Sequence, residues 1–238
     1  NNILPARLGE IARAYVLSKK KAISLPYSIS TVLLDRFFDL IGLLGMSFVF
    51  FPRAALPPRV SRMLFTFVGL LLLGIAILIS ASRRAVISKL IRKIAESRKP
   101  ISDKVMGRII EIQENLKRIN SPESFAILSL IAFFQWFSMS VSLYFVIRSF
   151  NVSLDPYYIP FVCALLNMGI TVPSSPGYIG LYQFLLTYLL SLFGVPKHEG
   201  FSVSIVYHAL WYIPYNALGL LFVTVEQIKL KELRELKR

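Results

Sequence analysis

Pro173-Ser174-Ser175-Pro176-Gly177-Tyr178-Ile179-Gly180 interrupts an apolar run that extends over residues 157–194. Proline removes a backbone donor and disfavours helix in the residue before it, and glycine frees the backbone. The stretch therefore predicts two short helices, residues 157–172 and 181–194, joined by irregular chain. Inside a membrane such chain must be buried in protein or line a wet cavity, because hydrocarbon cannot satisfy free N–H and C=O groups. This makes the interruption a candidate site.

The front of the chain carries a similar pattern. Pro5-Ala6-Arg7-Leu8-Gly9 reads P-x-x-L-G, and the stretch from Pro176 to Gly180 reads P-x-x-I-G. Corresponding Pro and Gly interruptions in two parts of a chain indicate a transporter built from structural repeats, with the substrate bound where the broken helices meet. The alternative is a chance match, which any membrane protein rich in Pro and Gly can produce.

The composition is too apolar for an ordinary soluble domain. Of the 238 residues, 55% are hydrophobic and 17% are charged, and the mean hydropathy is +0.61. These values are typical of an integral membrane protein. The formal net charge of +14 is concentrated between and after the apolar runs. That distribution indicates cytoplasmic loops and contact with anionic lipid rather than nucleic-acid binding.

Cys163 is the single cysteine, which excludes an intramolecular disulfide, and the two histidines show no zinc-ligand spacing. We therefore expect no metal and no cofactor. The chain begins at Asn1 without a signal-peptide pattern. We expect it to be a fragment that lacks its natural start.

Apolar runs predict the membrane spans. A helix that crosses the bilayer needs about 20 apolar residues, and four runs are long enough: residues 31–51, 63–81, 124–147 and 201–225. Residues 3–18 are amphipathic and too short, so they predict a re-entrant or interfacial half-helix, followed by the basic turn Lys19-Lys20-Lys21. With the broken pair, these runs predict an all-α membrane protein. Its expected architecture is a polytopic helical bundle with two re-entrant or broken segments, in a single domain over residues 1–238.

Residues 83–120 form the most basic loop, with eleven Lys or Arg residues against four acidic ones, a net charge of +7. Apolar residues within the loop follow the 4-3-4-3 spacing of an amphipathic helix: Val105, Ile109, Ile112, Leu116 and Ile119. We expect this loop and the basic tail, residues 229–238, in the cytoplasm, with the loop attracted to anionic headgroups. A coiled-coil partner is the alternative, but the repeat is short.

Asp35, Arg36 and Asp39 lie near the start of the run 31–51 and share one face of a helix. Charges inside a span are costly and usually face the bundle interior, so one interpretation is that they line a polar cavity. The other is that Arg36 neutralises Asp39 at i+3 near the interface, as helix pairs commonly do. Two acids against one base still leave a net charge to explain.

Four stretches together resemble the lysylphosphatidylglycerol synthase transmembrane family, also called flippase-like membrane proteins. The stretches are NNILPARLGEIARAYVL at the start, DRFFD at residues 35–39, PSSPGYIGLYQ at residues 173–183 and HALWYIPYNALGLL from His208. They follow the family's order over nearly the whole chain. The resemblance implies a polytopic helical domain with re-entrant segments, which in the multiple-peptide-resistance proteins flips an aminoacylated phospholipid across the membrane.

The resemblance also implies which residues bind the substrate. Family members often carry glutamate where this chain has Gln183, so a charge that a cationic substrate can use is absent. The soluble domain that makes lysylphosphatidylglycerol in the fused proteins is absent as well, so synthesis is not assigned to this chain. By position, the candidate substrate-binding residues are Arg7, Gly9, Glu10 and Arg13 in the first motif, Asp35, Arg36 and Asp39 in the second, Pro176, Gly177, Gly180 and Gln183 in the third, and His208 in the fourth.

These features favour a lipid translocase that holds a polar headgroup between its broken helices, with an aminoacylated or other phospholipid, or a glycolipid, as its substrate. A membrane-embedded enzyme with Asp35 or Asp39 and His208 as its acid–base pair is less favoured. The chain has no nucleophile elbow and no H-E-x-x-H motif, and a lone histidine in an aromatic segment is more often a packing residue.

Two further alternatives remain open at the level of sequence. One is the membrane part of a lysylphosphatidylglycerol synthase or another lipid-modifying transferase. The other is a non-transporting subunit that recruits a cytoplasmic lipid-modifying enzyme through residues 83–120. A homo-oligomer is also left open. In each case the chain is expected to be a multi-pass protein of the cell membrane.

Overall fold

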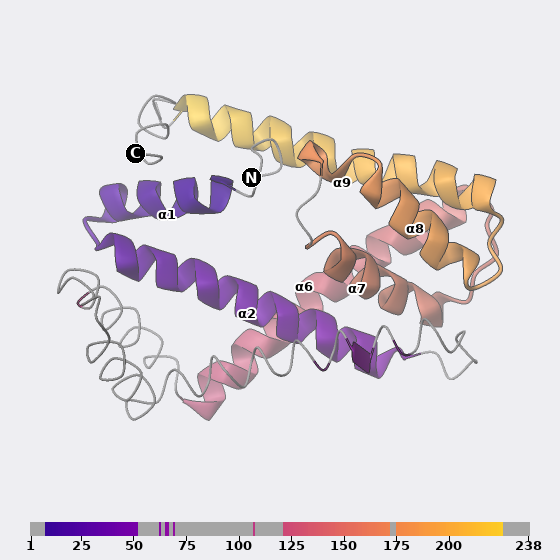
Figure 1. Ribbon diagram of the computed structural model, residues 1–238, viewed down its shortest axis with the longest axis horizontal. Coiled ribbons are helices and arrows are strands. Elements are labelled where there is room, and N and C mark those ends of the chain that lie inside the picture. Colours follow the sequence, from indigo (N-terminus) through magenta and orange to yellow (C-terminus); the bar gives the residue numbers. More distant parts are fainter. Residues whose placement is uncertain are drawn as a thin grey trace, which may run out of the picture. The chain divides into compact units, whose positions relative to one another are not determined.

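The computed structural model describes residues 8–51, 62, 65–66, 69, 107, 121–171 and 175–225. Within these residues the chain is helical and has no β-strand, which confirms the expected all-α class. The helices in Figure 1 are α1 (Leu8–Lys21), α2 (Leu25–Val49), α6 (Pro122–Ser149), α7 (Ile159–Gly169), α8 (Leu181–Ser191) and α9 (Lys197–Val225), with two 3-10 turns, η2 (Pro156–Tyr158) and η3 (Pro176–Tyr178).

The chain divides into two compact units, and helices α1, α2 and α6 each contribute residues to both. The first unit holds the described residues 8–13, 46–51, 135–171 and 175–225. The second unit holds residues 14–45, 121–134 and the few described residues between them. The candidate site belongs to the first unit.

In the second unit, a side-chain cap begins α2 and aromatic rings join α2 to α6. The Ser24 hydroxyl accepts a hydrogen bond from the Tyr27 N–H at 3.2 Å, which satisfies one of the free donors at the start of α2. Phe38 is buried, and its ring centroid lies 5.6 Å from that of Phe125 on α6. Aromatic pairs at this separation add to the energy of burial.

In the first unit, the end of α2 contacts α6 and η2. The Ser140 hydroxyl on α6 donates to the Met46 sulfur at 3.4 Å, and both residues are buried. The Tyr157 hydroxyl in η2 donates to the Val49 carbonyl at 3.2 Å, which satisfies a carbonyl that the end of α2 leaves free. The first contact joins α6 to α2, and the second joins the turn before α7 to the end of α2.

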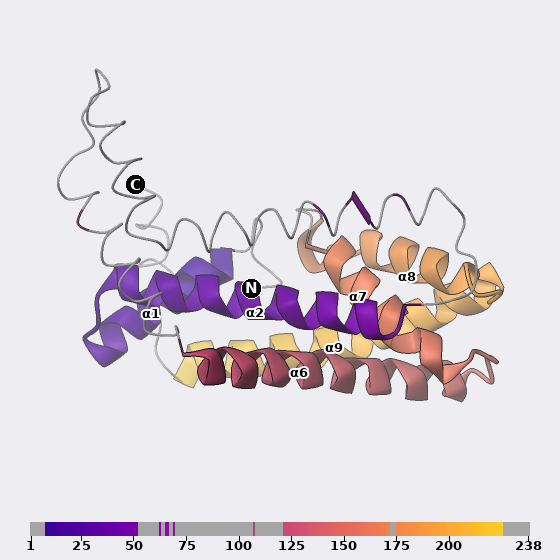
Figure 2. The ribbon, with the colours of Figure 1, turned by 90° about the horizontal axis from the view of Figure 1, so that it is seen from below.

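Helix α8 packs against both α7 and α9 (Figure 2), and glycines allow close approaches at both contacts. A Cβ at Gly169 would lie 2.7 Å from Leu185 Cδ1 on α8, so a larger residue would displace that side chain. A Cβ at Gly200, in the first turns of α9, would lie 3.5 Å from the Thr187 Cα, so the two helix backbones nearly touch there. The fully buried side chains of these helices include Phe161, Leu166, Tyr182, Leu186, Leu190, Val203 and Tyr207.

The structure bears out part of the expected span pattern. Among the described residues, α6 is the one helix that is long and apolar enough to cross a membrane by length and composition, with a mean hydropathy of 1.8. The other expected spans that are described fall on α2 and α9, which begin a few residues earlier than predicted, at Leu25 and Lys197. Their passage through the membrane stays a prediction.

Other expectations differ from the structure or lie outside it. The lysines expected as a basic turn, Lys19 to Lys21, instead form the last turn of α1, where cations are favoured by the helix dipole. Gly9 lies inside α1 whereas Gly180 precedes α8, so the two glycines of the proposed repeat do not occupy the same place. The repeat and the re-entrant path stay predictions. The expected span 63–81 and the basic loop 83–120 lie almost wholly outside the described residues.

Candidate functional site

The connection between α7 and α8 contains backbone that only a few residue types adopt readily. Gly177 and Gly180 have φ angles of +67° and +89°, and Tyr178 has a φ of +60°. A left-handed backbone costs a non-glycine residue about 1–2 kcal/mol. Two hydrogen bonds hold this conformation: the Tyr178 N–H donates to the Ser175 carbonyl at 2.9 Å, and the Ser175 hydroxyl donates to the Ile179 carbonyl at 2.6 Å. Strain of this kind is concentrated at functional sites in proteins.

Gly177 packs directly against α9. The residue is buried, and a Cβ there would lie 2.8 Å from the Tyr212 hydroxyl oxygen and 2.9 Å from a carbon of the same ring. These separations are below van der Waals contact, so no other residue fits without moving Tyr212. Gly177 therefore meets two requirements at once, a positive φ and contact with an aromatic ring.

Gln183 links the start of α8 to α9. Its side-chain oxygen accepts a hydrogen bond from the Gly180 N–H at 2.8 Å, and its side-chain nitrogen lies 2.9 Å from His208 Nδ1. A backbone N–H can only donate, so the amide oxygen faces Gly180 and the amide nitrogen faces the histidine. The amide N–H then donates to Nδ1, which must be unprotonated. His208 is therefore neutral, with its hydrogen on Nε2.

The other ring nitrogen of His208 has no such partner. The residue is 5% exposed, its ring stacks on Tyr182 at 4.4 Å between centroids, and the Tyr182 hydroxyl accepts a hydrogen bond from the Trp211 indole at 3.1 Å. Nε2 is buried and has no hydrogen-bond partner among the described residues. The Gly177 carbonyl lies near the ring, but no hydrogen bond of ordinary geometry joins them. An unsatisfied buried donor is unusual in a folded protein and needs an explanation.

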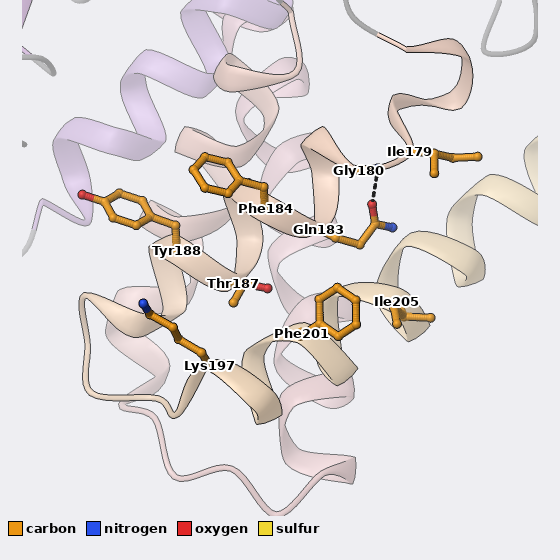
Figure 3. A pocket seen from close by; sticks show the side chains of 9 residues that line it. All are labelled: Ile179, Gly180, Gln183, Phe184, Thr187, Tyr188, Lys197, Phe201 and Ile205. Carbon is orange, nitrogen blue, oxygen red and sulfur yellow. Dashed lines mark hydrogen bonds between the residues drawn. The ribbon is translucent and has the colours of Figure 1, made fainter.

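A groove of about 690 Å³ begins at Gly180 and Gln183 and runs between α8 and α9 (Figure 3). Its apolar side chains are Ile179, Phe184, Tyr188, Phe201 and Ile205, and each of them is exposed. Thr187 and Lys197 are the remaining residues that line it. The volume is in the range of about 300–1,000 Å³ that small-ligand pockets have.

The sequence-predicted site residues fall into three groups. Pro176, Gly177, Gly180, Gln183 and His208 come together at the junction of η3, α8 and α9. On α1, Gly9 and Glu10 are half-buried and Arg13 is exposed, and Arg7 lies outside the described residues. On α2, Asp35 and Arg36 are exposed and Asp39 is half-buried.

The α2 charges form the ion pair that the simpler interpretation predicts. Arg36 Nη1 lies 3.1 Å from Asp39 Oδ2, at i and i+3. The side chains are 44% and 23% exposed, so the pair is not enclosed by protein. These residues belong to the second unit and His208 belongs to the first. Within the described residues, no group of three His, Cys, Asp or Glu side chains is placed to hold a metal ion.

Sequence reasoning missed Tyr182, Thr187 and Lys197. Tyr182 is buried beneath His208, and its spacing offers no polar pattern that would single it out. Thr187 follows Gln183 by four residues, so the two share a face of α8, which is a signal that the sequence did contain. Lys197 lies at a helix start that the sequence placed four residues later.

Known proteins resemble most of this chain in sequence. Residues 1–219 match the model of a family described as the lysylphosphatidylglycerol synthase TM region. A UPF0104 membrane protein of Methanocaldococcus jannaschii is 24% identical over 98% of this chain and 96% of its own length. A second UPF0104 membrane protein, from Methanothermobacter thermautotrophicus, is 25% identical over 93% of this chain and 69% of its own length. The glycosyltransferase AglD of Haloferax volcanii is 23% identical over 88% of this chain and 39% of its own length. No solved structure matches.

Proposed function

This chain belongs to the lysylphosphatidylglycerol synthase transmembrane family, and from that premise we propose that it is a lipid translocase. In this proposal the polar headgroup binds at the junction of η3, α8 and α9, while the hydrocarbon chains stay in the membrane. The family is a membrane family, and transporters built with broken helices hold their substrates where those helices meet.

The observation that carries the proposal is the buried Nε2–H of His208, which makes no hydrogen bond of ordinary geometry although the Gly177 carbonyl lies near it. Gln183 fixes the histidine as a neutral donor, and the donor lies beside the strained turn that contains Gly177. A protein gains nothing in stability from a buried donor without a partner, because the desolvation of that group costs about 1–3 kcal/mol. A ligand that supplies an acceptor oxygen would remove this cost.

The surroundings of His208 also favour one class of headgroup. Residues 175–193 and 200–222 contain no Asp or Glu, and the polar groups among them are hydroxyls, amides, an indole and the imidazole. An N–H donor binds a phosphate or sugar hydroxyl oxygen, whereas a lysyl ammonium needs an acceptor. We therefore favour a phosphate or a sugar hydroxyl as the group that His208 binds.

The test is lipid flipping by the purified protein in reconstituted vesicles. The variant His208→Phe keeps a ring on Tyr182 but removes the donor. We expect it to flip a fluorescent phosphatidylglycerol or glycolipid at least about tenfold more slowly, since hydrogen bonds to charged groups are worth about 1.5–3 kcal/mol. Tyr215→Phe, at an exposed position of the same helix, serves as the control and should flip normally. Normal flipping by a folded His208→Phe protein would remove His208 from the site.

A second candidate function rests on the relative named glycosyltransferase AglD, of which this chain matches 39%. In that case the chain would be the membrane part or membrane partner of an enzyme that modifies lipids. Replacement of residues 83–120 by a neutral linker distinguishes the translocase from the membrane partner of an enzyme. The partner role is favoured over transport if the unmodified protein does not flip lipid and the replacement abolishes co-purification of a cytoplasmic enzyme.

A further inference from the structure

One amide at the start of α8 serves two partners. The Gln183 side-chain oxygen accepts a hydrogen bond from the Gly180 N–H at 2.8 Å (Figure 3), and the side-chain nitrogen lies 2.9 Å from His208 Nδ1 on α9. Gly180 is the N-cap residue of α8, and Gln183 is the third residue of the helix. A glutamine at this position can satisfy the N–H of the N-cap residue, as in a capping box.

The bridge from Gly180 to His208 holds only while the histidine is neutral. In that state Nδ1 is an acceptor, and the amide N–H of Gln183 donates to it. A protonated imidazole has a hydrogen on both nitrogens, so Nδ1 becomes a donor that faces another donor. The Gln183 amide can restore this bond by turning its oxygen toward Nδ1. Its nitrogen then faces the Gly180 N–H, and neither of these two groups can accept.

The groups around His208 carry no charge of their own. Tyr182 on α8 stacks on the imidazole at 4.4 Å between centroids, and Trp211 and Tyr212 on α9 lie at 5.1 and 5.3 Å. The backbone of Gly177 in η3 also lies nearby. Tyrosine hydroxyls titrate at about pH 10, so the imidazole is the member of this cluster that can change charge near neutral pH. The face of an aromatic ring attracts a cation, so the stack with Tyr182 suits a protonated histidine.

The connection between α7 and α8 depends on the cap that Gln183 provides. Gly177, Tyr178 and Gly180 have positive φ angles, and backbone of this kind persists only where its surroundings determine it. Two hydrogen bonds lie within the turn, and the bond from Gly180 to Gln183 ties the turn to α8. Loss of that bond leaves the N–H of the N-cap residue without its partner and frees one end of the turn.

We propose that the connection between α7 and α8 is a proton switch, in which His208 binds a proton only when Gln183 releases the Gly180 N–H. The coupling is reciprocal: protonation uncaps α8, and a movement that uncaps α8 favours protonation. Glutamine is essential to it, because a glutamate can accept from Gly180 and from a protonated histidine at the same time. The proposal does not rest on lipid transport.

The test follows histidine protonation and the cap of α8 in the same sample, the purified chain in lipid nanodiscs. His198→Gln leaves His208 as the one histidine, so ¹⁵N-histidine NMR between about pH 8 and about pH 5 reports its hydrogens alone. Hydrogen exchange, corrected for its intrinsic pH dependence, reports the protection of backbone amides. We expect the hydrogen on Nε2 at the upper pH. As Nδ1 gains a hydrogen, protection at residues 180–184 should fall about fivefold, as expected for the loss of one helix cap, while residues 186–190 of α8 should stay protected.

Two variants of the His198→Gln protein distinguish the switch from a general effect of acid. In Gln183→Glu the carboxylate caps α8 in both states, so protection should stay constant while His208 becomes protonated. In His208→Phe protection should stay constant because the ring cannot be protonated. A fall in either variant equal to that of the parent would overturn the proposal.

Three results with the parent protein would also contradict the switch. They are a hydrogen on Nδ1 at the upper pH, unchanged protection through the titration of His208, and a histidine that stays neutral until the protein unfolds. Neither measurement involves lipid movement. A protein that shows the switch but does not flip lipid would therefore support this proposal and contradict the translocase, so the two proposals fail separately.

Discussion

At the scale of single residues, Gln183 determines the geometry of the candidate site. One amide satisfies the Gly180 N–H and His208 Nδ1 and thereby sets which histidine nitrogen carries the hydrogen. We expect Gln183→Ala to lower the free energy of unfolding by about 1–3 kcal/mol, because a buried histidine nitrogen loses its partner. Thermal unfolding of the purified protein in detergent, followed by tryptophan fluorescence, measures this change.

Gln183→Glu distinguishes the hydrogen bond to Gly180 from the hydrogen bond to His208. A carboxylate still accepts from Gly180 but cannot donate to Nδ1, so His208 must move its hydrogen to Nδ1 or gain a second one. We expect this variant to unfold close to the wild-type temperature. Gln135→Ala, at an exposed position of α6, is the control for loss of an amide. A Gln183→Ala protein as stable as the control would show that the bridge does not contribute.

Gly177 allows the backbone and packing costs to be measured separately. Gly177→Ala adds a Cβ at positive φ and 2.8 Å from the Tyr212 hydroxyl, whereas Gly194→Ala adds a Cβ at a φ of +85° with no atom within 4 Å. Both should lose about 1–2 kcal/mol for the backbone, and Gly177→Ala should lose more. In a Tyr212→Leu background the excess should shrink, because the two positions are in contact. Equal losses in the two alanine variants would contradict the packing of η3 against α9.

At the scale of elements, the charged residues of α2 allow a test of whether they belong to the substrate path. The Arg36–Asp39 pair is partly exposed, and pairs of this kind contribute about 0–1 kcal/mol to stability. We therefore expect Asp39→Asn to leave unfolding nearly unchanged and, if these charges line the substrate path, to abolish flipping in vesicles. Glu123→Gln, on the exposed first turn of α6, is the matched control. Full transport by Asp39→Asn would show that these charges do not belong to the substrate site.

The sequence predicted the broken helix because proline and glycine act locally. The prolines and glycines of residues 173–180 predict irregular backbone from local effects alone, and α8 begins at the predicted residue, Leu181, while α7 and α8 each end three residues before the predicted position. The start of α9 was missed because Lys197-His198-Glu199 is polar, and an apolar pattern cannot detect a polar first turn. The sequence identifies Gln183 and His208 as candidate substrate-binding residues, but their contact depends on the packing of α8 on α9. Sequence spacing carries no information about such a contact.

At the scale of the whole molecule, the topology of the chain in the membrane can be tested directly. The positive charge of residues 83–120 and 229–238 predicts that both segments are cytoplasmic. The same reasoning predicts that the turn before α9, with Lys197 and His198, is outside. The α7–α8 pair either forms a hairpin, which crosses the membrane zero times, or crosses it twice. Both paths leave the turn before α9 on the same side.

Single cysteines in a Cys163→Ala background test this arrangement. We expect Asn115→Cys and a cysteine at Leu230 to resist an impermeant thiol reagent applied to intact cells, because the charge distribution predicts that both positions are cytoplasmic. His198→Cys should react, since that residue is exposed and the charge distribution predicts that it lies outside. Permeabilised cells provide the control, in which all three positions should be labelled. Labelling of position 115 in intact cells would reverse the orientation of the chain. The turn before α9, with Lys197, would then face the cytoplasm.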